Sequence, residues 1–233
     1  KSMEDQSLKL ADSVFGQTVS GKWVYESEVI DYVEEDLIMI PDFTTIRKIP
    51  WNKEPTAQII CDLKYSDGSS SELAPRQVLK NVISTLQDEN LEAVVAPELE
   101  FYLCEQNLDP DLPLKTPVGK SGRRETGSRV FGIDAVNEFD ALTDDIYDYC
   151  EILKIGVDTL IHESGPSQIE INLNHGDPLA LADQAFMFKR AVRQVALKHG
   201  IHATFMAKPY QGHPGSSMHI HQNLINYNSK KNI

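Results

Sequence analysis

The chain has 233 residues, 41% of them hydrophobic and 24% charged, and a formal net charge of −13. This is the composition of a globular protein that can bury a sizeable core. Its acidity disfavours nucleic acid and anionic membranes as partners, because both bind cationic surfaces. Three cysteines without metal-like or redox spacing, no membrane-length apolar stretch and no apolar run in the N-terminal KSMEDQSLKL predict a cytoplasmic protein.

Residues 1–73 are predicted to form a small β-rich domain. Apolar or β-branched runs at Gly21–Tyr32, Asp36–Ile40 and Ala57–Leu63 have the composition of strands. The segment DFTTIRKIPW, between the last two runs, is expected to be a loop-rich connection that is closed by Pro50. YSDGSS then predicts a turn.

From Ala74 onward, helical and extended patterns alternate, which predicts an α/β or α+β domain over 74–233. Helices are expected in PRQVLKNVISTLQDEN, over Asp140–Leu153 and over Pro178–His199, the last one ended by Gly200 as a left-handed cap. A loop is expected over Asp109–Gly132. The expected strands are LEAVVAPELEFYL, VDTLIHE, SQIEINL, HATFMAKP and SSMHIHQNL.

Four of these strands pair an apolar face with a face of side chains that can bind metals. Side chains alternate along a strand, so PELEFYL presents Glu98 and Glu100 on the face opposite to Leu99. The other strands contribute Gln168, Glu170 and Asn172, then His219, His221 and Asn223, and finally Glu163 at the end of VDTLIHE. Taken alone, one such strand is explained more readily by a solvated face, and one such histidine by a core position.

The four polar faces together favour a metal site, because they carry no Lys or Arg. Carboxylates crowded on neighbouring strands repel one another, by on the order of several kcal/mol when partly buried, and a divalent cation is the simplest relief. Carboxylates and imidazoles without a thiolate favour Mg²⁺ or Mn²⁺ over structural zinc. The backbone amides of GHPGSSMH suit a small anionic substrate, although an ordinary tight turn explains this segment as well.

PELEFYL, HESGPSQIEINL and FMAKPYQGHPGSSMHIHQNL resemble the successive active-site motifs of the glutamine synthetase family, in order and in spacing. IMIPDFTTIRKIPW is similar to the N-terminal domain of that family, and APRQVL to the start of its catalytic domain. AVNEFDALTDDIYDYCEIL and PLALADQAFMFKRAVRQVALKHG are more similar to the γ-glutamylpolyamine (γ-glutamylputrescine) synthetase branch than to ammonia-using enzymes.

The resemblance implies an α+β fold and a set of site residues. A β-grasp-like domain is expected over 1–73, and over 74–233 a C-terminally truncated catalytic domain built on a curved antiparallel sheet. Two sites for Mg²⁺ or Mn²⁺ are implied, one formed by Glu100, Glu163 and Glu170, and the other by Glu98, His219 and a residue beyond position 233. The implied nucleotide contacts are Asp158, His221 and Asn223, and Gly215 lies in the loop that meets glutamate. The catalytic residues are expected beyond this chain.

The activity implied is that of an ATP-dependent glutamate–ammonia or glutamate–amine ligase. Metal-assisted phosphorylation of glutamate would give γ-glutamyl phosphate, which ammonia or a small polyamine-type amine then attacks. Pro214 stands where ammonia-using enzymes commonly have Asn in the glutamate loop. The N-terminal loop that supplies an Asp to the neighbouring subunit in ammonia-using relatives is not recognisable in VFGQTVSGKWVYE, which suits a bulkier amine. A cytoplasmic homo-oligomer, a ring or dodecamer by resemblance, is expected, and the 233-residue chain alone is expected to be inactive.

Two other functions stay open on the sequence. A non-catalytic glutamine-synthetase-like subunit would keep the fold without turnover, although its metal-capable residues are intact. A carboxylate–metal hydrolase would use the same carboxylates without ATP, but no residue in the sequence is clearly its general base.

Overall fold

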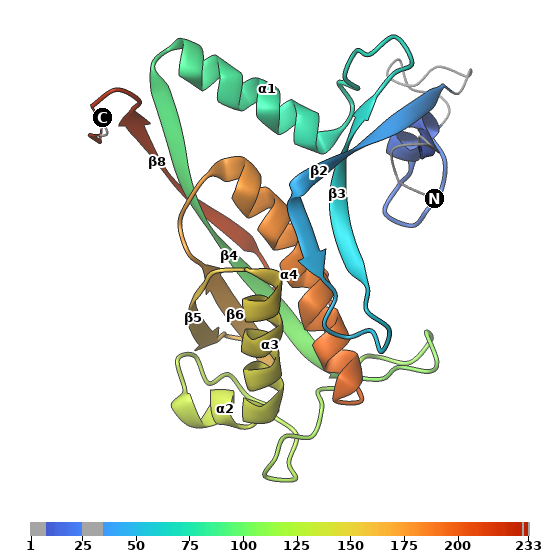
Figure 1. Ribbon diagram of the computed structural model, residues 1–233. Coiled ribbons are helices and arrows are strands. Elements are labelled where there is room, and N and C mark those ends of the chain that lie inside the picture. Colours follow the sequence, from blue (N-terminus) through green and yellow to red (C-terminus); the bar gives the residue numbers. More distant parts are fainter. Residues whose placement is uncertain (1–7, 25–34, 230, 233) are drawn as a thin grey trace. The chain divides into compact units, whose positions relative to one another are not determined.

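The computed structural model describes residues 8–24, 35–229, 231 and 232 (Figure 1). The chain divides into two compact units, one formed by Lys1–Ile46 with Ala57–Leu91 and the other by Arg47–Thr56 with Glu92–Ile233. A domain boundary between residues 73 and 74 stays a prediction. Most of the predicted strand Gly21–Tyr32 lies outside the described residues. None of the described helices has the length and apolarity needed to cross a membrane.

The first unit combines a three-stranded sheet with one α-helix. The strands β1 (Lys9–Ala11), β2 (Asp36–Lys48) and β3 (Ala57–Lys64) lie in the order β1-β2-β3, with β1 antiparallel to β2. A 3-10 helix, η1 (Asp12–Gly16), follows β1. The predicted helix is present as α1 (Pro75–Asp88), which begins with proline in its first turn.

The expected loop after Ile40 is wrong, because β2 continues to Lys48. DFTTIRK is part of this strand and not a connection, and its β-branched residues continue the strand beside β3. The Thr45 hydroxyl donates to the Asp42 carbonyl at 2.7 Å and accepts from the Ile60 amide at 2.9 Å. These bonds satisfy the backbone locally and hold β2 against β3.

Charged side chains join α1 to this sheet. The Arg76 guanidinium donates to the carboxylates of Asp42 at 2.6 Å and Asp62 at 2.5 Å, and Lys80 also reaches Asp62. Hydrogen bonds from Thr44 and Arg76 lower the pKa of Asp42 to about 2. Both carboxylates therefore stay ionised, and their pairing with one guanidinium fixes the helix on the strands.

The second unit is built on a five-stranded sheet (Figure 1). Its strands are β4 (Leu91–Glu105), β5 (Val157–His162), β6 (Gln168–Leu173), β7 (Ile201–Thr204) and β8 (Met218–Asn226). Their order is β5-β6-β4-β7, and β8 also pairs with β4. β4 is antiparallel to both β6 and β7. This sheet confirms the α+β class.

The helices of this unit are α2 (Ile133–Asn137), α3 (Asp140–Leu153) and α4 (Pro178–Lys198). The bounds of α3 are as predicted, and Gly200 follows α4 with the left-handed φ of +72° expected of a helix stop. The short helix α2 was not predicted. HATFMAKP is extended only as far as Thr204, so its predicted strand is too long.

The core of this unit lies between β4 and α4. Leu99, Phe101 and Leu103 alternate along β4 and are at most 1% exposed, as the strand pattern predicts. Phe188 of α4 stacks edge-on against Phe101, with ring centroids 6.5 Å apart. The apolar face of β4 is therefore buried under α4, and the polar face is left to the site.

Replacing Phe188 by Ala should lower the free energy of unfolding by about 3–5 kcal/mol, because it opens a cavity against Phe101. Phe186→Ala on the same helix is the matched control, since Phe186 is 57% exposed and its loss should cost less than about 1 kcal/mol. Urea unfolding followed by circular dichroism measures both. Equal losses in the two variants would contradict this description of the core.

Candidate metal centre

The register between β4 and β6 places carboxylates side by side. Glu100 lies directly opposite Glu170, and Glu98 lies opposite Asn172. Glu100 is 8% exposed and Glu170 is 6% exposed. The alternative that these strands simply turn a solvated face to water is therefore wrong for these two residues.

Strand β8 adds imidazoles beside these carboxylates. His219 Nδ1 lies 3.3 Å from one oxygen of Glu98, and His221 Nε2 lies 3.0 Å from the other. Ligand atoms of Glu98, Glu170 and His219 all lie within 4.8 Å of one another. Three segments that are distant in the sequence thus converge on one spot. We call Glu98, Glu170 and His219, together with Glu100 opposite Glu170, the carboxylate cluster.

Glu100 is held in place by polar neighbours. Gln168 Nε2 donates to its Oε2 at 3.0 Å, and the Ser217 amide donates to the same oxygen at 3.1 Å. The Ser217 hydroxyl bonds to the other oxygen and also lies 3.2 Å from His219 Nε2. Ser217 was not among the predicted site residues; its position two residues before His219, on the same alternation, was the signal available.

Glu163 stands at the edge of this group. The Ser164 amide donates to its carboxylate at 3.0 Å, and its own amide donates to the Gln168 carbonyl at 2.8 Å. Glu163 is outside the set of three converging ligand atoms, but its charge acts on Glu170. The turn 163–167 thus keeps this carboxylate close to the cluster.

The electrostatics of the cluster favour a cation. Burial, followed by the charges of Glu98, Glu163 and Glu100, raises the pKa of Glu170. Within residues 8–24, 35–229, 231 and 232, no Lys or Arg forms an ion pair with these four carboxylates. Carboxylate oxygens and an imidazole nitrogen are ligands of hard or borderline divalent ions, so the donor set fits Mg²⁺ or Mn²⁺.

The loop before β8 is tied to the polar face of the sheet. Gln168 Nε2 donates to the Gly215 carbonyl at 2.9 Å, and the Tyr102 hydroxyl donates to the Pro214 carbonyl at 2.8 Å. A Cβ added at Gly215 would lie 2.6 Å from the Ala207 carbonyl oxygen, so only glycine fits there. Gln168 and Tyr102 therefore act as anchors for this loop.

The three predicted nucleotide contacts have different neighbours in the structure. His221 lies beside Glu98, whereas the Asn223 amide donates to Asn232 at 2.9 Å. Asp158 is exposed on β5, and its charge contributes to raising the pKa of Tyr147. The nucleotide roles of these residues stay predictions.

An antiparallel sheet that gathers buried carboxylates and an imidazole on one face defines a candidate metal-dependent protein of the α+β class. Residues 72–233 match the family model described as glutamine synthetase, catalytic domain. The chain therefore belongs to the glutamine synthetase family, which confirms the resemblance of its motifs.

Individual relatives agree with this assignment. The chain is 36% identical over 217 residues to the gamma-glutamylputrescine synthetase PuuA of Escherichia coli K12, covering 92% of this chain and 46% of the relative. It is 32% identical over 199 residues to the glutamate–isopropylamine ligase of a Pseudomonas species, covering 81% of this chain and 40% of the relative. It thus spans less than half the length of these curated relatives.

A solved structure described as a novel glutamine synthase homolog has the same fold. It superposes with a TM-score of 0.79 at 19% identity, covering 94% of this chain and 48% of that chain. At this level of identity the likeness supports the fold alone.

Glu170→Gln should make the metal-free protein more stable at pH 7.5. Because the folded-state pKa of Glu170 lies above its ordinary value of 4.5, the protonated form contributes stability below about pH 4.5, and this contribution is lost as the pH rises through the raised pKa. The Glu170→Gln variant is neutral at every pH and therefore keeps this stability at pH 7.5. The measurement is urea unfolding in EDTA at pH 4 and pH 7.5.

The gain should be absent at pH 4, where wild-type Glu170 is protonated. Glu151→Gln, on the exposed side of α3, is the control and should show no gain at either pH. A wild type that is as stable as Glu170→Gln at pH 7.5 would show that the carboxylates do not repel one another.

Proposed function

We propose that this chain carries the metal-binding part of an ATP-dependent ligase that joins glutamate to an amine. The observation that carries the proposal is the convergence of Glu98, Glu170 and His219 on one spot without a compensating Lys or Arg among the described residues. Membership of the glutamine synthetase family supports it. Relatives named as gamma-glutamylputrescine synthetase and glutamate–isopropylamine ligase support an amine acceptor.

The reaction brings together two anions, ATP and the γ-carboxylate of glutamate. Divalent ions, when bound, would neutralise the phosphates and the developing charge of phosphoryl transfer. We propose Glu100, Glu163 and Glu170 for one ion, and Glu98 with His219 for a second. Gln168 and Ser217 orient Glu100 by hydrogen bonds, which keeps the carboxylate fixed before any ion arrives.

The loop at Gly215 is proposed to meet glutamate. Its backbone is held by Gln168 and Tyr102, so its position relative to the carboxylate cluster is fixed by bonds from the same strands. Burial, with the charges of Glu100 and Glu163, raises the pKa of Tyr102 to about 12. Tyr102 therefore remains a neutral donor to the Pro214 carbonyl at physiological pH.

A polyamine-type amine is the proposed acceptor, and ammonia is the alternative. We also propose that the enzyme is a cytoplasmic homo-oligomer and that Asp158, His221 and Asn223 face the nucleotide. The rival functions, a non-catalytic subunit and a carboxylate–metal hydrolase, share the metal site. They differ from the ligase in needing neither ATP nor glutamate.

Metal affinity tests the cluster without relying on turnover. Titration of Mn²⁺ by isothermal calorimetry should give at least about tenfold weaker binding for Glu98→Gln and for His219→Ala, because each removes a ligand atom. His199→Ala is the matched histidine control, since His199 pairs with Asp145 of α3. Wild-type affinity in His219→Ala would remove His219 from the metal site.

Turnover tests the ligase assignment in the intact protein that contains this chain. Phosphate release should require ATP, glutamate and an amine, and should be faster with putrescine than with ammonium or ethanolamine. Glu170→Ala should lower kcat by at least about 100-fold, because phosphoryl transfer depends on charge neutralisation. Phosphate release that needs no glutamate would support the hydrolase, and no release with any amine would support the non-catalytic subunit.

A further inference from the structure

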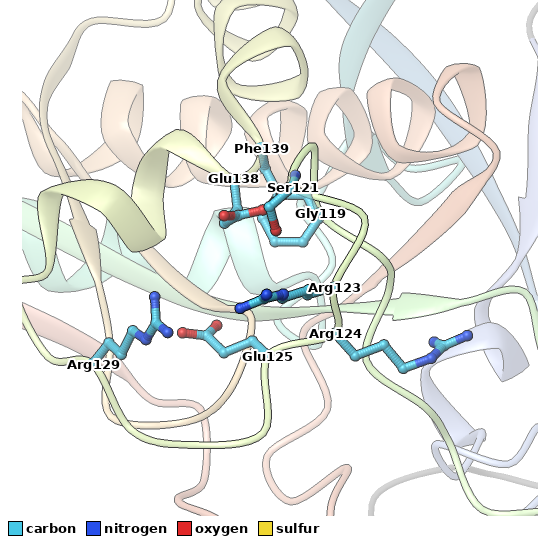
Figure 2. A pocket seen from close by; sticks show the side chains of 8 residues that line it. All are labelled: Gly119, Ser121, Arg123, Arg124, Glu125, Arg129, Glu138 and Phe139. Atoms are coloured by element: carbon cyan, nitrogen blue, oxygen red, sulfur yellow. Dashed lines mark hydrogen bonds between the residues drawn. The ribbon is translucent and has the colours of Figure 1, made fainter.

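A second polar site lies in the second unit, in a cavity of about 380 Å³ (Figure 2). It is formed by the loop before α2 together with the residues just ahead of α3. Its charged lining consists of Arg123, Arg124, Arg129, Glu125 and Glu138. None of the predicted metal, nucleotide or substrate residues lines it.

The guanidinium groups of this cavity differ in whether they are already paired. Arg124 is occupied, because it bonds to the Glu105 carboxylate and to the Thr116 carbonyl. Arg123 and Arg129 form no side-chain hydrogen bond or ion pair with any residue in the described part of the chain. Two cations therefore face the cavity without a fixed partner.

Glu138 is already engaged at the wall of the cavity. Its Oε2 accepts from the Ser121 amide at 3.1 Å. This bond, with smaller contributions from the charges of Lys120 and Arg129, lowers the pKa of Glu138. The Glu138 side chain also lies so close to Gly119 that a Cβ added at residue 119 would clash with it.

Glu125 is the unusual member of the lining. Its side chain is 9% exposed, and its Oε2 lies 2.8 Å from His162 Nε2 and accepts from the Ser167 amide at 2.6 Å. Its Oε1 is buried and has no hydrogen-bond partner. Figure 2 shows the carboxylate between the side chains of Arg123 and Arg129 in the pocket. A buried carboxylate oxygen without a donor is costly, so a donor brought by a ligand would be stabilised here.

We propose that this cavity binds a small zwitterion of the amino-acid type. The ligand carboxylate would lie on Arg123 and Arg129, because guanidinium groups match carboxylates in charge and in planar geometry. Its ammonium would donate to Glu125 Oε1. A simple anion would leave that oxygen unpaired, and a simple cation would face two guanidiniums. The volume lies within the range of small-molecule sites.

The position of Glu125 gives such a ligand a route to the carboxylate cluster. The other oxygen of Glu125, Oε2, bonds to His162 and to the Ser167 amide. These two residues flank the turn that contains Glu163. A ligand on Glu125 therefore shares one carboxylate with the segment that positions a proposed metal ligand.

Calorimetric titration of the protein in EDTA and without ATP tests the proposal. The probes are the protein amino acids other than glutamate and glutamine, together with 4-aminobutyrate; glutamate and glutamine are omitted because the proposed function gives them another site. At least one probe should bind once per chain with a Kd below about 10 mM, and acetate, ethylamine and inorganic phosphate should each bind at least about tenfold more weakly. Failure of ligase activity would leave this result unaffected.

Variants locate the binding. Arg123→Gln and Arg129→Gln should each weaken it at least about tenfold, whereas Arg124→Gln should not, because that guanidinium is already paired. Unchanged melting temperatures establish that the variants are folded. The proposal is overturned if no zwitterion binds, if acetate or phosphate binds as tightly as the best zwitterion, or if binding survives in Arg123→Gln and Arg129→Gln.

Discussion

Repulsion between carboxylates on neighbouring strands is the constraint on which the rest of the second unit depends. Glu100 and Glu170 face each other across β4 and β6 and are nearly buried, and the charges of Glu98 and Glu163 also act on Glu170. Such a group raises the free energy of the metal-free fold, because each carboxylate loses water and gains like-charged neighbours. The proposed divalent ions would offset this cost.

The surrounding structure keeps the carboxylates together despite their repulsion. The apolar face of β4 is locked under α4, so the strand cannot turn its glutamates away without exposing Phe101 and Leu103. On the polar face, Gln168 and Ser217 donate to Glu100. Packing on one side and hydrogen bonds on the other therefore fix the positions of these carboxylates.

The arginine-lined cavity extends the same logic to a second site. Glu125 bonds to His162 and Ser167, which flank the turn of Glu163, so one buried carboxylate connects the cavity to that turn. Unlike the glutamates of the cluster, Glu125 lines a cavity together with arginines, which is why we propose a ligand that carries both charges. The two sites therefore differ in the charge of the ligand proposed for them because their own charged residues differ, and not because the chain as a whole is acidic.

Much of the fold and part of the site were accessible from the sequence. Alternation and helical spacing predicted β4, β6, α3 and α4, because these elements bury one face and therefore have apolar residues at regular intervals in the sequence. The predicted strand for β2 ended too early, since the hydrogen bond from the Ile60 amide of β3 to the Thr45 hydroxyl is formed between strands and leaves no periodic pattern in the sequence. Ser217 was missed because its role depends on the pairing of β8 with β4.

By itself, the sequence determined the family, the α+β class and which side chains share a strand face, because these follow from residue order and the two-residue period of a strand. Only the tertiary structure decided that Glu98, Glu170 and His219 meet, that Gln168 and Tyr102 anchor a loop, and that Glu125 lines one cavity with Arg123 and Arg129. Register and loop position arise from contacts between residues far apart in the chain. No local pattern encodes them.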